Sequence, residues 1–164
     1  MKKILFFIAV SSLAFTSCSK KGDPGATGPA GNANVHSYSF TIAPGDWQHQ
    51  GTAGNDYELF VDLPVTAITA SMITSGQVLI NWDLSGTVTT LPVTIPSGTN
   101  IYFYQPTFKL GSARVEIYRQ DNQAFTANSN FSFRVVVINE SARLAHPEVN
   151  WSSPSAVNKA LGVF

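Results

Sequence analysis

The chain has 164 residues, of which 44% are hydrophobic and only 12% charged, and its ten basic and ten acidic side chains give no net charge. This length suits one hydrophobic core. Four basic side chains and one acidic side chain precede His36, which leaves six basic and nine acidic side chains for the rest of the chain. Such a balance excludes the basic surface of a nucleic-acid-binding protein, so no nucleic-acid partner is predicted.

Residues 1–17 have the layout of a secretory signal peptide. Lys2 and Lys3 precede the apolar stretch Ile4–Phe15, which only two serines interrupt. This stretch is too short to cross a bilayer, because a membrane-spanning helix needs about 20 apolar residues. We therefore expect a leader that is removed.

The single cysteine, Cys18, directly follows this leader. The small residues Thr16 and Ser17 before it look like a bacterial lipobox, in which the cysteine is acylated and becomes the mature N-terminus. The alternative is cleavage by ordinary signal peptidase, which would leave a free thiol. Because no good A-x-A cleavage site competes, we predict that Cys18 is a lipidation site and anchors the chain to a membrane.

A glycine-rich spacer occupies residues 18–34 and contains four successive Gly-X-Y triplets over residues 22–33. This period is typical of a collagen-like triple helix, which would make the protein a trimer. Four triplets are very short, however, and bacterial chains normally lack hydroxyproline, so an extended polar tether is the better explanation. We favour the tether.

The residues from 35 to 164 are predicted to form a single β domain, because short segments of alternating apolar and polar residues follow one another between turn signals. Strands are expected at 35–42, 57–63, 77–83, 87–93, 101–104, 107–110, 113–119 and 131–138. Loops are expected at 46–56 and 121–130, and residues 67–74 could form a helical turn or a strand. Ser155 is expected to cap a final helix, 156–161, which ends at Gly162.

The alternation also predicts which side chains face the core. In the first strand His36, Tyr38, Phe40 and Ile42 should face one side, and Trp82 should be interior beside Val78 and Ile80. Glu58, Asp62, Arg114, Glu116 and Tyr118 should face outward. The segment 131–138 is the most apolar and should be a central strand. Together these features predict an antiparallel β-sandwich with a short C-terminal helix, and a closed barrel is the second choice.

The chain resembles a group of uncharacterised lipoproteins of Gram-negative bacteria that carry a short collagen-like spacer after the lipidated cysteine. The matching features are Ser17-Cys18-Ser19-Lys20, the Gly22 to Gly31 repeat, Trp47, Tyr57, Leu63-Pro64, Gly76-Gln77-Val78-Leu79, Leu91-Pro92, the 131–138 strand and the terminal helix. The resemblance implies a location in the cell envelope, at the outer membrane, on its periplasmic or its outer face. It implies no activity.

Motifs of catalysis and metal binding are absent from the sequence. The three histidines are scattered, and no HExxH, GxSxG, P-loop or GxGxxG occurs. Asp46, His49, Asp56 and Glu58 could meet as a calcium site, but they lack the spacing of a calcium-binding loop. We therefore predict no enzyme activity, no cofactor and no metal.

The aromatic residues are the better functional lead. Trp47, Trp151, Tyr102 and Tyr104 are the candidate ligand-binding residues, because exposed rings on a sandwich stack against sugars or contact partner proteins. The alternative is that they pack in the core and on the sheet faces. The expected function is a non-catalytic binding or structural module of the cell envelope, with a glycan or an envelope protein as partner. A carbohydrate-binding accessory lipoprotein of an outer-membrane uptake system is the second hypothesis.

Overall fold

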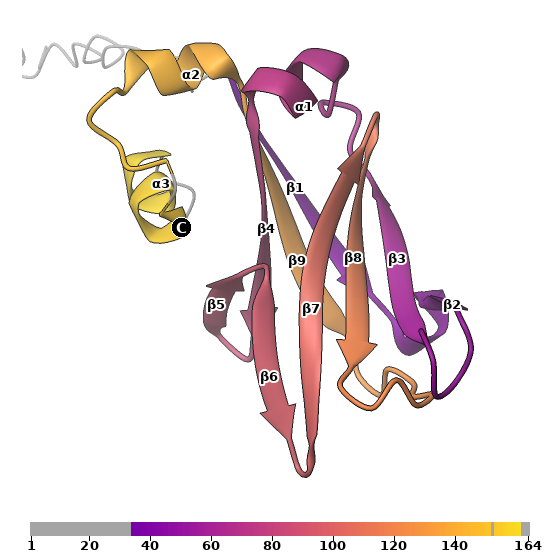
Figure 1. The fold of residues 1–164 in the computed structure, drawn as a ribbon. Helices are drawn as coiled ribbons and strands as arrows, with labels where there is room; N and C mark the ends of the chain where they lie inside the picture. Colours follow the sequence, from indigo (N-terminus) through magenta and orange to yellow (C-terminus); the bar gives the residue numbers. More distant parts are fainter. Residues whose placement is uncertain (1–33, 152, 162–164) are drawn as a thin grey trace, which may run out of the picture. The chain divides into compact units, whose positions relative to one another are not determined.

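Two antiparallel sheets form most of the structure, a computed structural model that describes residues 34–151 and 153–161 (Figure 1). The four-stranded sheet has the order β1 (Val35–Ile42), β9 (Phe131–Ile138), β4 (Gln77–Leu84), β5 (Thr87–Thr90). The five-stranded sheet has the order β2 (Gln48–Gln50), β3 (Glu58–Pro64), β8 (Ser112–Arg119), β7 (Asn100–Lys109), β6 (Val93–Ser97). The two sheets share no strand and form no closed barrel. The predicted all-β sandwich is therefore confirmed, and the barrel that was the second choice is not.

Residues from both sheets fill the space between them. Those with the lowest exposure alternate along their strands with residues of the opposite face, as period two requires. They include Leu59, Leu63, Ile80, Trp82, Val115, Ile117, Phe133, Val135 and Val137. Strand β9 lies between β1 and β4, which confirms that it is central. Each fully buried side chain of this kind stabilises the fold by about 1.5–3 kcal/mol.

A second apolar cluster lies on the other face of the four-stranded sheet. It joins Leu79 and Val136, which alternate with core residues along β4 and β9, to Val157 and the half-buried Trp151 of the C-terminal segment. Gln77 Nε2 donates to the carbonyl oxygen of Trp151 over 2.6 Å and so adds a polar tie. Strand β9 is therefore apolar on both faces at the end that this segment covers.

The short helices are η1 (Pro44–Asp46), α1 (Ala70–Ser75), α2 (Glu140–Ala145) and α3 (Pro154–Leu161). The ambiguous segment 67–74 contains helix α1, because Thr69 Oγ1 accepts from the Met72 N–H and caps its first turn. Helix α2 was not predicted. Helix α3 confirms the terminal helix but not its cap, because Ser153 Oγ accepts from the Ala156 N–H over 3.4 Å while Pro154 occupies the first turn.

Several strand boundaries differ from the predicted ones. The predicted strand 87–93 is two strands in different sheets, β5 and β6, and the chain crosses between the sheets at Leu91–Pro92, whose peptide bond is cis. The two predicted strands 101–104 and 107–110 form the single strand β7. Its Pro106 is tolerated because it lies beyond Tyr104, the last residue of the β6 pairing, and pairs only with Val115.

One side-chain prediction and one loop prediction need correction. His36 is exposed, because it lies at the end of β1, where it lines an open hollow with Thr69 and Ser71 instead of facing the other sheet. The expected loop 46–56 contains strand β2, which extends the five-stranded sheet beside β3.

The predicted leader, the predicted lipidation site Cys18, most of the predicted tether and Gly162 lie outside the described residues. Within the part of the chain that the structure describes, no helix has the length and apolar character needed to cross a membrane.

Candidate functional site

An aromatic cleft lies between the two sheets, where the segment 125–131 enters strand β9. Its volume is about 360 Å³. Strands of both sheets contribute to it, together with the irregular loop between β8 and β9. The lining residues are Leu59, Trp82, Leu84, Ile95, Ser97, Tyr102, Tyr104, Ile117, Phe125, Thr126, Ala127, Asn128, Ser129 and Phe131.

Three rings form the buried floor of the aromatic cleft. The ring centroids of Trp82 and Tyr104 are 4.6 Å apart, and those of Trp82 and Phe131 are 5.3 Å apart with nearly parallel planes. The three residues lie on β4, β7 and β9, and their exposed fractions are between 5% and 8%. Rings held at these distances by three strands form a fixed apolar surface.

Phe125 and Tyr102 form the aromatic part of the rim, and both are half-buried. Their ring centroids are 5.3 Å apart in an edge-to-face arrangement. Phe125 also packs edge-to-face against Tyr57, whose hydroxyl group donates to the Phe125 carbonyl oxygen over 3.4 Å. These contacts attach the middle of the long β8–β9 loop to the five-stranded sheet.

Polar groups complete the rim of the aromatic cleft. Ser97, Thr126, Asn128 and Ser129 are exposed and line it. Burial, together with the neighbouring Tyr102, raises the pKa of the Tyr104 phenol to about 12, so this group is a neutral hydroxyl at physiological pH. A pocket of this volume, apolar inside with a few hydroxyl and amide groups at its mouth, matches the usual form of a small-ligand site.

The structure brings together two of the four predicted ligand-binding residues. Tyr102 and Tyr104 line the aromatic cleft, whereas Trp47 and Trp151 do not. Trp47 is half-buried and packs edge-on against Phe131, with ring centroids 5.2 Å apart. Trp151 is held in the second apolar cluster, and its Nε1 donates to the His146 carbonyl oxygen over 3.2 Å.

Sequence reasoning missed Phe125 and placed Trp82 in the core only. Phe125 is the one aromatic residue in the polar stretch 121–130, and an isolated ring in such a loop is a usable signal. Trp82 is buried as predicted, but one side of it contributes to the floor of the aromatic cleft. Whether an interior ring borders a cavity depends on the spacing between the sheets, which alternation does not encode.

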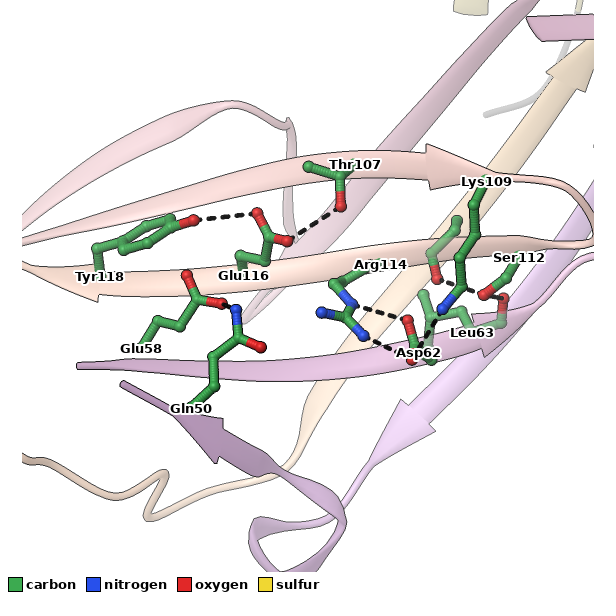
Figure 2. A network of polar contacts seen from close by, with 11 residues as sticks. Gln50, Glu58, Asp62, Leu63, Thr107, Lys109, Ser112, Arg114, Glu116 and Tyr118 are labelled. Carbon is green, nitrogen blue, oxygen red and sulfur yellow. Dashed lines mark hydrogen bonds and ion pairs between the residues drawn. The ribbon is translucent and has the colours of Figure 1, made fainter. Parts of the chain in front are cut away.

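A network of polar contacts covers the outer face of the five-stranded sheet (Figure 2). Glu58 and Glu116 face outward as predicted, yet only 4% and 9% of their surfaces are exposed. Gln50 Nε2 donates to Glu58, while Thr107 Oγ1 and the Tyr118 hydroxyl each donate to Glu116 over 3.1 Å. Burial and hydrogen bonding to Glu58, with Glu116 nearby, raise the pKa of Tyr118, which therefore stays a proton donor.

The other half of this network centres on Asp62. Its two carboxylate oxygens accept from Nε and an Nη of Arg114, both over 2.8 Å, and Lys109 Nζ lies 3.3 Å away. The Arg114 guanidinium also lies 4.0 Å above the ring of Phe60 and covers this outward-facing phenylalanine. Hydrogen bonds from Arg114 hold the pKa of the Asp62 carboxyl below its usual range.

Asp62→Asn should therefore make the free energy of unfolding less dependent on pH in the acidic range. A carboxyl with a depressed folded-state pKa contributes stability above its unfolded pKa of about 3.9, and this contribution is lost as the pH falls through the folded-state value. Because Asp62 is about one-third exposed, we expect less than about 1 kcal/mol at pH 7. Urea unfolding at pH 7 and pH 3 measures the difference. If Asp62→Asn shows the same difference in unfolding free energy between pH 7 and pH 3 as the wild type, the proposed role of Asp62 is contradicted. Asp46→Asn is the control.

The four candidate calcium ligands each have a local role in the structure. Asp46 accepts from the Ala43 N–H over 2.8 Å, Asp56 accepts from the Thr52 N–H over 2.7 Å, and Glu58 is bound by Gln50. His49 stacks on Tyr57. Among the residues that the structure describes, no three His, Cys, Asp or Glu side chains are placed to hold a metal ion.

Comparisons with known protein families, with curated proteins and with solved structures returned no match to this chain.

Proposed function

We propose that this protein is a lipoprotein of the cell envelope, anchored to the outer membrane through Cys18, whose β-sandwich is a non-catalytic binding module. The observation that supports binding is the aromatic cleft, because it combines a rigid apolar floor with hydroxyl and amide groups at its mouth. The observation that supports anchoring is the apolar leader that ends at a single cysteine.

Cys18→Ala should abolish incorporation of radiolabelled palmitate and move the protein from the membrane fraction to the soluble fraction. Both effects have one cause, because Cys18 is the residue that carries the acyl chains. Without these chains the protein has no stable anchor in the membrane. Ser19→Ala is the matched control and should label normally. Labelling that persists in Cys18→Ala would refute the anchoring part of the proposal.

The second candidate function is a carbohydrate-binding accessory lipoprotein of an outer-membrane uptake system. It is favoured by the half-buried ring of Tyr102 on the rim, beside the exposed polar groups of Ser97 and Asn128. Aromatic rings contact the C–H faces of sugars, and neighbouring polar groups bind their hydroxyls.

Tyr102→Ala should weaken glycan binding by roughly tenfold or more, which corresponds to about 1.4 kcal/mol. A glycan array identifies the ligand, and isothermal titration with wild type and variant measures the loss. Tyr38→Ala is the matched control, because Tyr38 is another half-buried tyrosine and does not line the aromatic cleft. An array without binding, or equal affinities for the two variants, would remove this function.

A further inference from the structure

The most exposed aliphatic side chains of the domain come from three separate segments. Among the described residues, the large hydrophobic side chains with the highest exposure are Leu144 at 74%, Leu110 at 65% and Ile73 at 50%. Ile73 lies on helix α1, Leu144 on helix α2, and Leu110 in the turn between β7 and β8. A single exposed leucine is ordinary on a protein surface, so the question is whether these three lie together.

Strand register places the three segments at the same end of the sandwich. Ile138, the last residue of β9, pairs with Val35 at the start of β1 and with Gln77 at the start of β4. Helix α1 leads into β4 and helix α2 follows β9, so both helices lie at this end of the four-stranded sheet. The turn between β7 and β8 joins them there, because the Gly111 N–H donates to the Ile68 carbonyl oxygen over 2.8 Å.

The same end receives the chain from the predicted anchor. The Asn139 N–H, just before helix α2, donates to the carbonyl oxygen of Asn34 over 2.8 Å, and Asn34 is the first residue that the structure describes. Arg143 Nη1 donates to the Ser75 carbonyl oxygen over 3.1 Å and so ties helix α2 to helix α1. We call this end, which comprises residues 34, 70–75, 110–111 and 140–145, the entry end.

The predicted anchor keeps the entry end close to lipid. Residues 18–33 link the acylation site to it, and a chain of this length spans at most about 55–60 Å. A short link of this kind makes contact with the same membrane an intramolecular event, with an effective concentration on the order of millimolar. A few aliphatic side chains are then sufficient for docking, although they would bind a free protein only weakly.

The chemistry of the entry end favours a lipid surface over a protein partner. Its three most exposed side chains are aliphatic, whereas tryptophan, tyrosine and arginine dominate the centres of protein interfaces and leucine is under-represented there. Charges of both signs are present, because Lys109 Nζ lies 3.3 Å from Asp62 and Arg143 lies one turn after Glu140 on helix α2. These charges cancel, so the apolar side chains supply the affinity and zwitterionic lipid is sufficient.

We propose that the entry end docks on the membrane surface, with Ile73, Leu110 and Leu144 inserted at the level of the lipid headgroups. The inference rests on the proposed anchoring through Cys18 and adds the lipid surface as a partner of the β domain itself. The anchor alone would leave the orientation of the domain undetermined, whereas docking by one end fixes it.

This orientation turns the aromatic cleft away from the membrane. Strand β4 begins at the entry end with Gln77 and finishes at the far end with Leu84. Ser97 pairs with Asn100, the first residue of β7, which runs from the far end to the turn that contains Leu110. Leu84 and Ser97 both line the aromatic cleft, so a docked domain presents the cleft to the aqueous side.

Spin labels on the full-length protein in phosphatidylcholine vesicles test the docking. Acylation occupies the sulfur of Cys18, so a nitroxide reagent reacts only with a cysteine introduced by Leu110→Cys or Leu144→Cys, one at a time. Collisions with oxygen, which partitions into hydrocarbon, and with a water-soluble nickel chelate give the depth of each label. We expect both labels about 5–10 Å into the boundary between headgroups and acyl chains. Val88→Cys, an exposed apolar position at the far end, is the matched control and should report water.

Removal of the other two aliphatic side chains should lift the domain from the lipid. With the label at position 110, Ile73→Ser combined with Leu144→Ser should lower the ratio of docked to undocked domain by roughly tenfold or more. Val88→Ser, measured with the same label, should leave this ratio unchanged. An equal ratio in the two backgrounds would overturn the assigned surface.

The remaining outcomes separate docking from anchoring and from other partners. Labels protected from both oxygen and the nickel chelate would show that protein, such as a second copy of this chain, covers the entry end, and would overturn the proposal. Labels at 110 and 144 that are as accessible to nickel as the label at 88, on protein that floats with the vesicles, would overturn docking and leave the anchoring intact. Reaction of the wild-type chain with the nitroxide at Cys18 would show a free thiol and overturn the anchoring, and this proposal with it.

Discussion

Phe133→Ala should lower the free energy of unfolding by about 3–5 kcal/mol, the largest loss that we expect from a single substitution in the sandwich. Phe133 lies on the central strand β9 with 2% of its surface exposed. Its ring centroid is 6.0 Å from that of Phe131, 6.2 Å from that of Trp82 and 6.4 Å from that of Trp47. Removing the ring would leave a cavity between rings that belong to different elements and cannot close it without moving strands.

Urea denaturation at neutral pH measures this effect, and Phe108→Ala is the matched control. Phe108 is 38% exposed near the end of β7, so the same truncation should change the free energy of unfolding by about 0.5 kcal/mol or less. If Phe133→Ala fails to fold, Phe133→Leu should give an intermediate loss. Equal losses at positions 133 and 108 would contradict the assigned core.

Val157→Asp should release the C-terminal segment and leave the sandwich folded. The Val157 side chain is fully buried against Leu79 and Val136 of the four-stranded sheet. An unpaired carboxylate at this position costs several kcal/mol of desolvation, and the substitution also removes the apolar contacts of the valine with the sheet. The core between the sheets does not include this valine, so the loss of structure should be local.

Amide hydrogen exchange distinguishes local from global loss. We expect protection in helices α2 and α3 to fall by roughly 100-fold or more, which corresponds to about 2.7 kcal/mol, while β3 and β8 keep theirs. Ala160→Asp introduces the same charge at an exposed position of helix α3 and should change little. Equal loss of protection in the sheets and the helices would show that the segment is part of the main cooperative unit.

The two hollows of this domain differ in the way that they could be recognised. The aromatic cleft contains two residues that aromatic content alone identified, Tyr102 and Tyr104. A hollow of about 240 Å³ on the outer face of the four-stranded sheet contains none of the predicted ligand-binding residues, because Ser39, Asn81 and Arg134 look like ordinary polar positions on three separate strands. Only their register places them in one row.

The class of the fold, and the face on which many side chains lie, follow from the order of apolar and polar residues along the chain. Alternation along β8 assigned Val115 and Ile117 to the core and Glu116 to the outer face, and the apolar run of β9 identified the central strand. These properties follow from backbone geometry, since successive side chains of a strand point to opposite faces.

The pairing of the strands, and therefore which surfaces are covered, depends on contacts between distant parts of the chain. Glu58 faces outward as its position in β3 requires, but Gln50 and Tyr118 from neighbouring strands bury it. The same holds for the crossing between sheets at Leu91–Pro92 and for the covering of Val136 by the C-terminal segment. Alternation is a local property, whereas burial on a sheet's outer face depends on residues far away in the chain.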